Sequence, residues 1–452
     1  MSSTAVFFFS LILGIAFIVV ATTRWKLHPV VALLVTAYGL GLANGLPAKD
    51  VVPALTGGFG GTLSHIGIVI ACGCVIGTLL EKSGAATALA QAVIRLIGAS
   101  KAVLGLSCTG AIVSIPVFCD SGFVILAPLA KSLARNSGRA IATFAIALAM
   151  GLYTTHCLVP PTPGPIAAAG ALGADIGWVM LLGGIVAIPV IIITYLFALW
   201  AGRREPHPLP TAIANDEPDS PPFDSGTGSL CDATLPILLP LTAIGLRSVA
   251  MLPSRPLGDG LVLSFLQFIG EPNTALIIGL LLAFFLTRRF GKETLGQWTS
   301  TGLHQAGIII LITGAGGALG GVLRATPMAG TIGDLLGNVQ LGSLNILLPF
   351  LVAAILKTAL GSSTVALITT ASLMAPVLSG LGLSAGFGPI LATLAVASGS
   401  MVVSHANDSF FWVVTQVSGL SVSQGYRLLT MASLIAGTTA MLIVWLLGLL
   451  LL

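Results

Sequence analysis

Apolar stretches of about 20 residues recur along the whole chain and are separated by short polar segments. A helix needs about 20 residues to cross roughly 30 Å of hydrocarbon, so the pattern predicts a protein that crosses a membrane many times. We interpret the first stretch as a retained span because no basic residue precedes it and no small-residue cleavage site follows it. The expected spans are residues 4–22, 28–45, 60–81, 139–160 and 176–201, followed by 233–251, 259–287, 302–324, 388–406 and 427–451.

Two further apolar segments, 102–134 and 342–380, are too long for one helix each and are interrupted by "IPVFCDSG" and "KTALGSST". We interpret each as two short helices that form a re-entrant hairpin, entering and leaving the membrane on one side. Two of the spans also run into helix-breaking residues, so we expect broken helices over 139–171 and 388–416.

The polar segment 203–232 divides the chain nearly in half and contains six of the 15 acidic residues and six prolines. It is typical of a flexible aqueous linker. The flanking parts, 1–202 and 233–452, share similar motifs in the same order, which indicates a duplication. Because each half has five crossings, the second half begins on the opposite side, and we expect two inverted-topology repeats.

Composition agrees with a membrane protein and adds an orientation. The chain is 56% hydrophobic and 8% charged, with a mean hydropathy of +1.04, whereas soluble domains carry about 25% charged residues. If the N-terminus is outside, 14 of the 19 basic residues lie in inner loops. The positive-inside rule therefore predicts both termini outside and the linker in the cytoplasm. The dispersed net charge of +4 does not indicate nucleic-acid binding.

Four helix interruptions occupy equivalent positions in the two halves, at 119–122, 160–165, 361–364 and 407–409. Broken helices at membrane depth persist where the freed backbone faces protein or a watery cavity, and in secondary transporters they mark the substrate site. Inverted repeats would bring the four breaks together near the midplane. Amides at half-helix N-termini favour anions, so a small carboxylate substrate fits.

At these interruptions the chain resembles a known family. The motifs "IPVFCDSGFVILAPL", "PPTPGPIAAAGALGADIG", "GSSTVALITTA" and "SHANDSFFW" are similar to those of the gluconate permease family of proton symporters, within the ion transporter superfamily. The resemblance implies inner-membrane import of gluconate or a related hydroxycarboxylate by proton symport. It also implies a homodimer with a scaffold domain and a mobile, elevator-type transport domain.

The substrate within that class stays open, because family members also take up D-serine, glycerate or other hydroxycarboxylates. This chain has Cys119 and Thr162 where the family pattern has an aromatic residue and a histidine. Sodium coupling is the alternative to proton coupling. The candidate substrate-binding residues are Asp120, Ser121, Gly122, His156, Thr162, Gly164, Ser362, Ser363, Thr364, Asn407, Asp408 and Ser409.

The coupling candidates are Asp120, Asp408, His156 and His405. Intramembrane carboxylates are costly and usually functional, although each of the two could instead cap a half-helix. The histidines could titrate near neutral pH or stay neutral against backbone groups. Lys357 could neutralise a substrate carboxylate, but we favour its snorkelling to the outer interface.

Other functional classes lack their signatures. Cys72 and Cys74 have no His or Cys partner at metal spacing, so we expect no metal site. His-Glu-x-x-His does not occur, and an enzyme would leave the proline break and the duplication unexplained; the resemblance argues against a channel. Because the nucleotide-binding motif Gly-x-x-x-x-Gly-Lys-Ser/Thr is also absent, we expect no cofactor and an ion gradient as the energy source.

Overall fold

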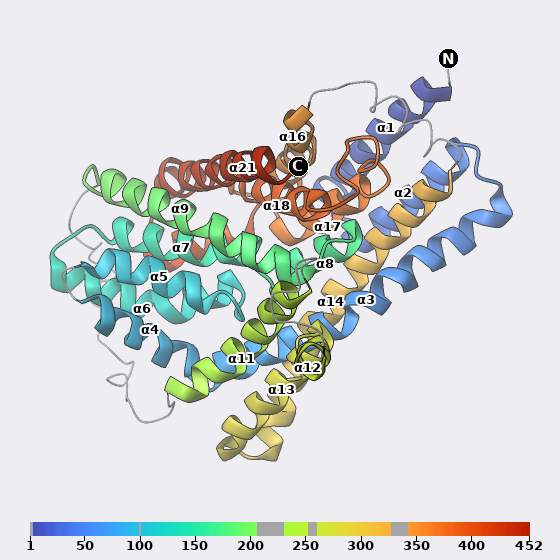
Figure 1. Cartoon of the computed structure of the whole chain (residues 1–452). Coiled ribbons are helices and arrows are strands. Elements are labelled where there is room, and N and C mark those ends of the chain that lie inside the picture. Colours follow the sequence, from blue (N-terminus) through green and yellow to red (C-terminus); the bar gives the residue numbers. More distant parts are fainter. Residues whose placement is uncertain (1–2, 99–100, 206–229, 252–259, 327–341) are drawn as a thin grey trace.

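The computed structural model describes residues 3–98, 101–205, 230–251, 260–326 and 342–452. Every regular element in these ranges is a helix, which confirms the all-helical prediction (Figure 1). Residues 206–229, the larger part of the expected linker, lie outside the described residues.

Two long helices, α3 (Ala48–Lys82) and α14 (Lys292–Ala325), lie side by side in Figure 1. With 35 and 34 residues they are longer than the expected spans 60–81 and 302–324, and α3 bends by 48° between Ser64 and Ile66. Their contact includes Gly58, where a Cβ would overlap the carbonyl oxygen of Gly317. The helices α1 (Ser3–Thr23) and α2 (Pro29–Ala43) complete this side, with α2 packed on α14.

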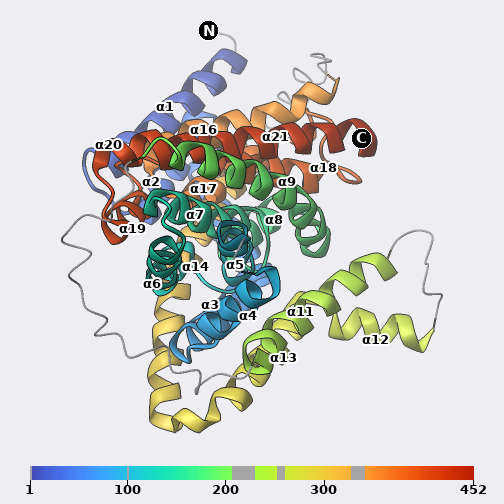
Figure 2. The same ribbon diagram turned by 90° about the vertical axis from the view of Figure 1, so that its left-hand side faces the viewer.

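The segment expected as one span at 259–287 is instead two helices, α12 (Leu261–Ile269) and α13 (Pro272–Thr287). The break has a local cause, because Pro272 lacks an amide donor and starts the second helix. Glu271 then caps α13 by accepting a hydrogen bond from the amide of Thr274 at 2.9 Å. Figure 2 shows that α12 and the preceding α11 (Leu230–Ala250) project from the main body of helices.

The rest of the first half forms a bundle. The segment 102–134 contains two helices with an irregular connection at 114–118 between them, and the expected broken helix is interrupted at 159–162. An additional helix, α4, precedes them and was not among the expected spans. The elements are α4 (Ala85–Ile97), α5 (Ala102–Val113), α6 (Cys119–Ser137), α7 (Ile141–Leu158), α8 (Pro163–Leu172) and α9 (Ile176–Gly202).

The described part of the second half after 341 also contains a helix pair and an interrupted helix. Two helices with a short connection at 361–362 occupy the segment 342–380, and a second interruption falls at 402–408. The elements are η3 (Gly342–Ile346), α16 (Leu347–Leu360), α17 (Ser363–Met374), α18 (Gly388–Met401), α19 (Ser409–Ser418), α20 (Val422–Gly425), η4 (Tyr426–Thr430) and α21 (Met431–Leu451).

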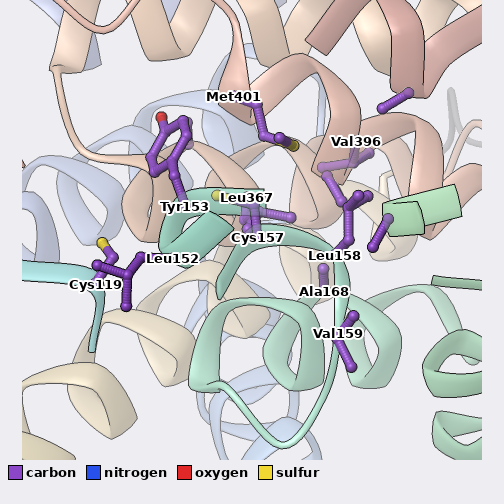
Figure 3. Packing of buried hydrophobic residues seen from close by; sticks show 14 of the residues in the cluster. Cys119, Leu152, Tyr153, Cys157, Leu158, Val159, Ala168, Leu367, Val396 and Met401 are labelled. Atoms are coloured by element: carbon purple, nitrogen blue, oxygen red, sulfur yellow. The ribbon is translucent and has the colours of Figure 1, made fainter. Parts of the chain in front are cut away.

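The lengths and burial of these helices confirm a multi-pass membrane protein. Among the described residues, five helical stretches are long and apolar enough to cross a bilayer, while other apolar helices have only 10–17 residues. Every residue of α7 and α18 is buried, so these two helices form the centre of the molecule. In Figure 3, buried side chains of the first half, such as Cys157 and Leu158, face Leu367, Val396 and Met401 of the second.

Candidate functional site

The site forms where four helices begin. The residues that precede α6, α8, α17 and α19 are Phe118, Thr162, Ser362 and Asp408. Helix α6 packs on α19 and α8 packs on α17, so each contact joins one element of the first half to one of the second. A helix N-terminus carries a partial positive charge of about half an elementary unit and unpaired amides. The arrangement therefore gathers anion-favouring groups from both halves.

A buried ion pair lies at this junction. The Lys357 ammonium is 2.6 Å from Oδ2 of Asp408, and the two side chains are 0% and 5% exposed. The expectation that Lys357 snorkels to the outer interface was wrong. Helix α16 ends at an internal break rather than at a membrane surface, so the side chain reaches the opposite helix start instead.

The two helix ends that carry the pair favour its charges. Lys357 lies in the last turn of α16, where a cation is stabilised, and Asp408 caps α19, where an anion is stabilised. The other carboxylate oxygen of Asp408 accepts the amide of Phe410 at 3.1 Å. The Ser404 hydroxyl donates to Oδ2 at 2.5 Å. Both oxygens of the buried carboxylate are therefore satisfied, as an intramembrane charge requires.

Gly361 shapes the connection between α16 and α17. Its φ of +80° is in the left-handed region, and a Cβ there would overlap the carbonyl oxygen of Asn407. The Lys357 ammonium also donates to the carbonyl oxygen of Gly361. The tip therefore packs directly on the break between α18 and α19.

Asp120 occupies the more accessible part of the site. It lies in the first turn of α6 and is half-buried. Its Oδ1 accepts a hydrogen bond from the Ser409 hydroxyl at 3.4 Å, and Ser409 itself is exposed. Both acids therefore lie at the start of α19: Asp408 caps this helix, and Asp120 contacts Ser409, its first residue. One acid is buried and paired with a cation, and the other is accessible.

Tyr153 is a site residue that the sequence analysis missed. Its hydroxyl shares a 2.7 Å hydrogen bond with the hydroxyl of Ser363 and donates to the carbonyl oxygen of Ser400 at 3.3 Å. The ring stacks on Phe410 at 5.4 Å, and the Lys357 ammonium lies 5.8 Å from the ring centroid. Figure 3 shows Tyr153 among the buried residues near Cys119. The available signal was the position of this tyrosine in a run of polar residues, Tyr153 to His156, near the end of an apolar helix.

The two histidines have different surroundings. His156 is buried beside the Phe118 ring at 5.9 Å, and its Nδ1 has no hydrogen-bond partner among the described residues. His405 Nε2 lies 2.9 Å from the carbonyl oxygen of Thr358, which Asn407 Nδ2 also contacts at 2.8 Å. His405 and Asn407 therefore bind the last carbonyls of α16, a contact that fits the backbone-bonded alternative for His405.

The remaining candidates line the helix starts. The Thr162 hydroxyl donates to the carbonyl oxygen of Val159 at 2.7 Å, and Ser362 caps α17 by accepting the amide of Val365 at 3.3 Å. Gly164 of α8 packs on Leu367 of α17. Ser121 and Gly122 lie in the first turn of α6, and Thr364 lies in the first turn of α17. Gly122 is buried, whereas Ser121 and Thr364 are half-buried.

By their chemistry these groups are suited to an anion and to proton exchange rather than to a metal ion. In the part of the chain that the structure describes, no group of three His, Cys, Asp or Glu side chains could hold a metal ion. Helix starts joined by irregular backbone, with buried charges between them, define a membrane transport protein.

The family follows from sequence comparison. The profile of the GntP family permeases matches residues 6–450, and the chain belongs to this family. It is 34% identical to a Pseudomonas aeruginosa gluconate permease, over 100% of this chain and 99% of that protein. It is 34% identical to the Escherichia coli inner membrane permease YgbN and 33% identical to the E. coli D-serine transporter DsdX, in both cases over 96% of each chain. The protein is therefore a permease and not an enzyme.

Two solved structures share the fold. Neisseria gonorrhoeae MtrF superposes with a TM-score of 0.69 at 14% identity, covering 95% of this chain and 96% of that one. The Alcanivorax borkumensis YdaH transporter superposes with a TM-score of 0.64 at 16% identity, covering 93% and 98%. At these identities the likeness concerns the fold alone.

Proposed function

We propose that this protein is a secondary active transporter of the inner membrane that imports gluconate or a related small hydroxycarboxylate together with a proton. The main observation that supports this proposal is the buried ion pair of Lys357 and Asp408 at the junction of four helix starts. Permeases named for gluconate among its relatives support the substrate class.

The pair suggests how an anion and a proton are coupled. While Asp408 is ionised it neutralises Lys357, so a second carboxylate gains little from approaching that ammonium. Protonation of Asp408 removes this partner and leaves a buried cation that needs an anion. The substrate carboxylate then replaces Asp408 beside Lys357, and the proton and the anion move together. Asp120, half-buried next to Ser409, is the second candidate proton carrier.

Polar groups around the pair suit the rest of a hydroxycarboxylate. Hydroxyls of Ser362, Ser363, Thr364 and Ser409 and the amide group of Asn407 can donate to or accept from substrate hydroxyls. The start of α6 adds amides for the carboxylate, whereas α8 offers only the amide of Gly164 in its first three residues, because Pro163 and Pro165 have no N–H. The Nδ1 of His156 has no partner within the described part of the chain, so we propose it as a group available to a ligand or a proton.

The movement that we propose is of the elevator type. Helices α3 and α14 would form the scaffold, and the bundle with the four helix starts would move against them as one body. Each half contains a helix pair followed by an interrupted helix, which supports inverted-topology repeats, each with a re-entrant hairpin, at 102–134 and 342–380. The proposed homodimer rests on the family resemblance, and light scattering of the purified protein tests it.

Uptake into proteoliposomes tests this function. Labelled gluconate should accumulate when the outside is acidic, and collapse of the proton gradient should abolish accumulation. Full accumulation without a proton gradient, driven by sodium instead, would refute proton coupling.

D-serine is the second candidate substrate, because the similarity to a D-serine transporter favours it. Competition of gluconate uptake by unlabelled gluconate, glycerate and D-serine ranks the candidates. The strongest competitor at equal concentration identifies the substrate class. If none of the three competes, the small-acid proposal fails.

A further inference from the structure

A basic cavity lies away from the proposed transport site, where α5 and α7 begin and α9 ends. Its volume is about 310 Å³. Three cationic side chains line it, those of Lys101, Arg139 and Arg203, and we call it the basic pocket. Among the residues that the structure describes, no acidic residue lines the cavity.

Close packing of α9 on α7 builds the basic pocket. Gly202 is the last residue of α9, and a Cβ on it would overlap the side-chain hydroxyl of Thr143 in the first turn of α7. Only a glycine allows this approach. It brings Arg203, the next residue, to the cavity that Arg139 lines from the start of α7.

The described lining of the pocket holds three positive charges and no negative one. In the ranges that the structure describes, none of the three side chains forms an ion pair. The pocket also meets the N-termini of α5 and α7, and no side chain caps either helix. Three cations and two sets of helix-start amides repel one another, and an anion bound between them would offset this repulsion.

The neighbouring surface indicates what kind of anion fits. Ile192, Leu196 and Trp200 are 47%, 54% and 52% exposed and are spaced four residues apart on α9. They form one exposed apolar stripe, which runs along α9 to the same helix end as the pocket. Trp200 stacks under the Arg204 guanidinium at 4.0 Å, and Tyr195 lines the pocket. Aromatic and basic side chains at the end of an apolar stripe are typical of the headgroup level of a membrane.

We propose that the basic pocket binds the phosphate group of an anionic phospholipid, with the acyl chains lying along the α9 stripe. A free phosphate ion would use the cations but not the stripe, so an exposed apolar stripe at the same end of α9 favours the lipid. Basic pockets between transmembrane helices on the cytoplasmic side are suited to such headgroups. All three cations belong to the side that the charge distribution predicts to be cytoplasmic.

Lipid binding to the purified, delipidated full-length protein tests the proposal. Phosphatidylglycerol added to the protein in neutral detergent should raise its apparent melting temperature, because a ligand that binds the folded state stabilises it. Phosphatidylcholine and inorganic phosphate at the same concentration should have no such effect. An equal rise with inorganic phosphate would overturn the lipid assignment.

Matched variants locate the site. The double variant Arg139→Gln/Arg203→Gln should bind phosphatidylglycerol about ten- to thirty-fold more weakly. The control Lys82→Gln/Arg95→Gln removes the same charge from exposed positions on the same predicted side and should change binding less than about two-fold. Equal weakening in both variants would overturn the proposal.

The single variant Lys101→Gln keeps the test decisive if the double variant does not fold. It should weaken binding about three- to five-fold. Unchanged binding in this variant would also count against the pocket. The readout does not depend on transport, so this inference and the proposed function can fail separately.

Discussion

The buried pair of Lys357 and Asp408 makes a quantitative prediction. Removing one partner of a buried ion pair leaves an uncompensated charge and costs about 3–5 kcal/mol, whereas replacing both partners is far less costly. The Lys357 side chain is 0% exposed, so water cannot compensate for a lost partner. We therefore expect Lys357→Met and Asp408→Asn each to destabilise the protein by about 3–5 kcal/mol.

The double variant should be more stable than either single variant. Asn is as good a helix N-cap as Asp, so Asp408→Asn can still accept the Phe410 amide and keep α19 capped. With Lys357→Met in the same chain, no unpaired charge remains. The loss should then fall to about 1–2 kcal/mol, a strong departure from additivity.

Unfolding of purified variants in one detergent measures this cycle, with proton-driven accumulation followed on the same samples after reconstitution. We expect the double variant to be folded but unable to accumulate substrate. The partly exposed pair of Arg247 and Asp175, at 3.6 Å, provides the control. Arg247→Met should cost at most about 1 kcal/mol. Additive losses at Lys357 and Asp408, or single variants as stable as the parent, would refute the reasoning.

Three further predictions address other parts of the molecule. Asp120→Asn should abolish accumulation and leave counterflow intact if Asp120 serves coupling; normal accumulation would remove it from the mechanism. Gly361→Ala should impair folding or transport, because the added Cβ would overlap the carbonyl oxygen of Asn407. The control Gly382→Ala, at a φ of +69° with open space around it, should lower the free energy of unfolding by only about 1 kcal/mol, as measured by thermal unfolding. A membrane-impermeant thiol reagent should label Cys231 only after cells are opened, and labelling of intact cells would reverse the predicted topology.

Local patterns were sufficient for the positions of most elements. Prolines at 160–165 and the small residues of "KTALGSST" end helices wherever the chain packs, so the breaks near them could be predicted. The same reasoning could have found the break before Pro272, where Gly270 and Glu271 precede a proline in an apolar run. The prediction of one continuous span over 259–287 was wrong because the hydrophobicity of the segment was given more weight than these helix-breaking residues.

Side-chain partners could not be predicted in the same way. Asp120 and Asp408 were identified because acids in apolar surroundings are costly, but their partners come from other helices. Ser409 is 289 residues from Asp120 in sequence, and Lys357 is 51 residues from Asp408. The misassignment of Lys357 shows the limit, because one helix end looks the same in sequence whether it meets a membrane surface or another helix.

The amino-acid sequence by itself determined a helical, multi-pass membrane protein with interrupted helices and isolated intramembrane acids. These properties depend on hydrophobic length, proline, glycine and the cost of burying charge, all of which act within a short segment. Only the tertiary structure decided that Asp408 is paired with Lys357, that Tyr153 reaches Ser363, and which helix starts lie in contact. A hydrogen bond or ion pair forms only when its two atoms lie within a few ångströms of each other. Whether they do depends on how helices that are far apart in the sequence pack against one another.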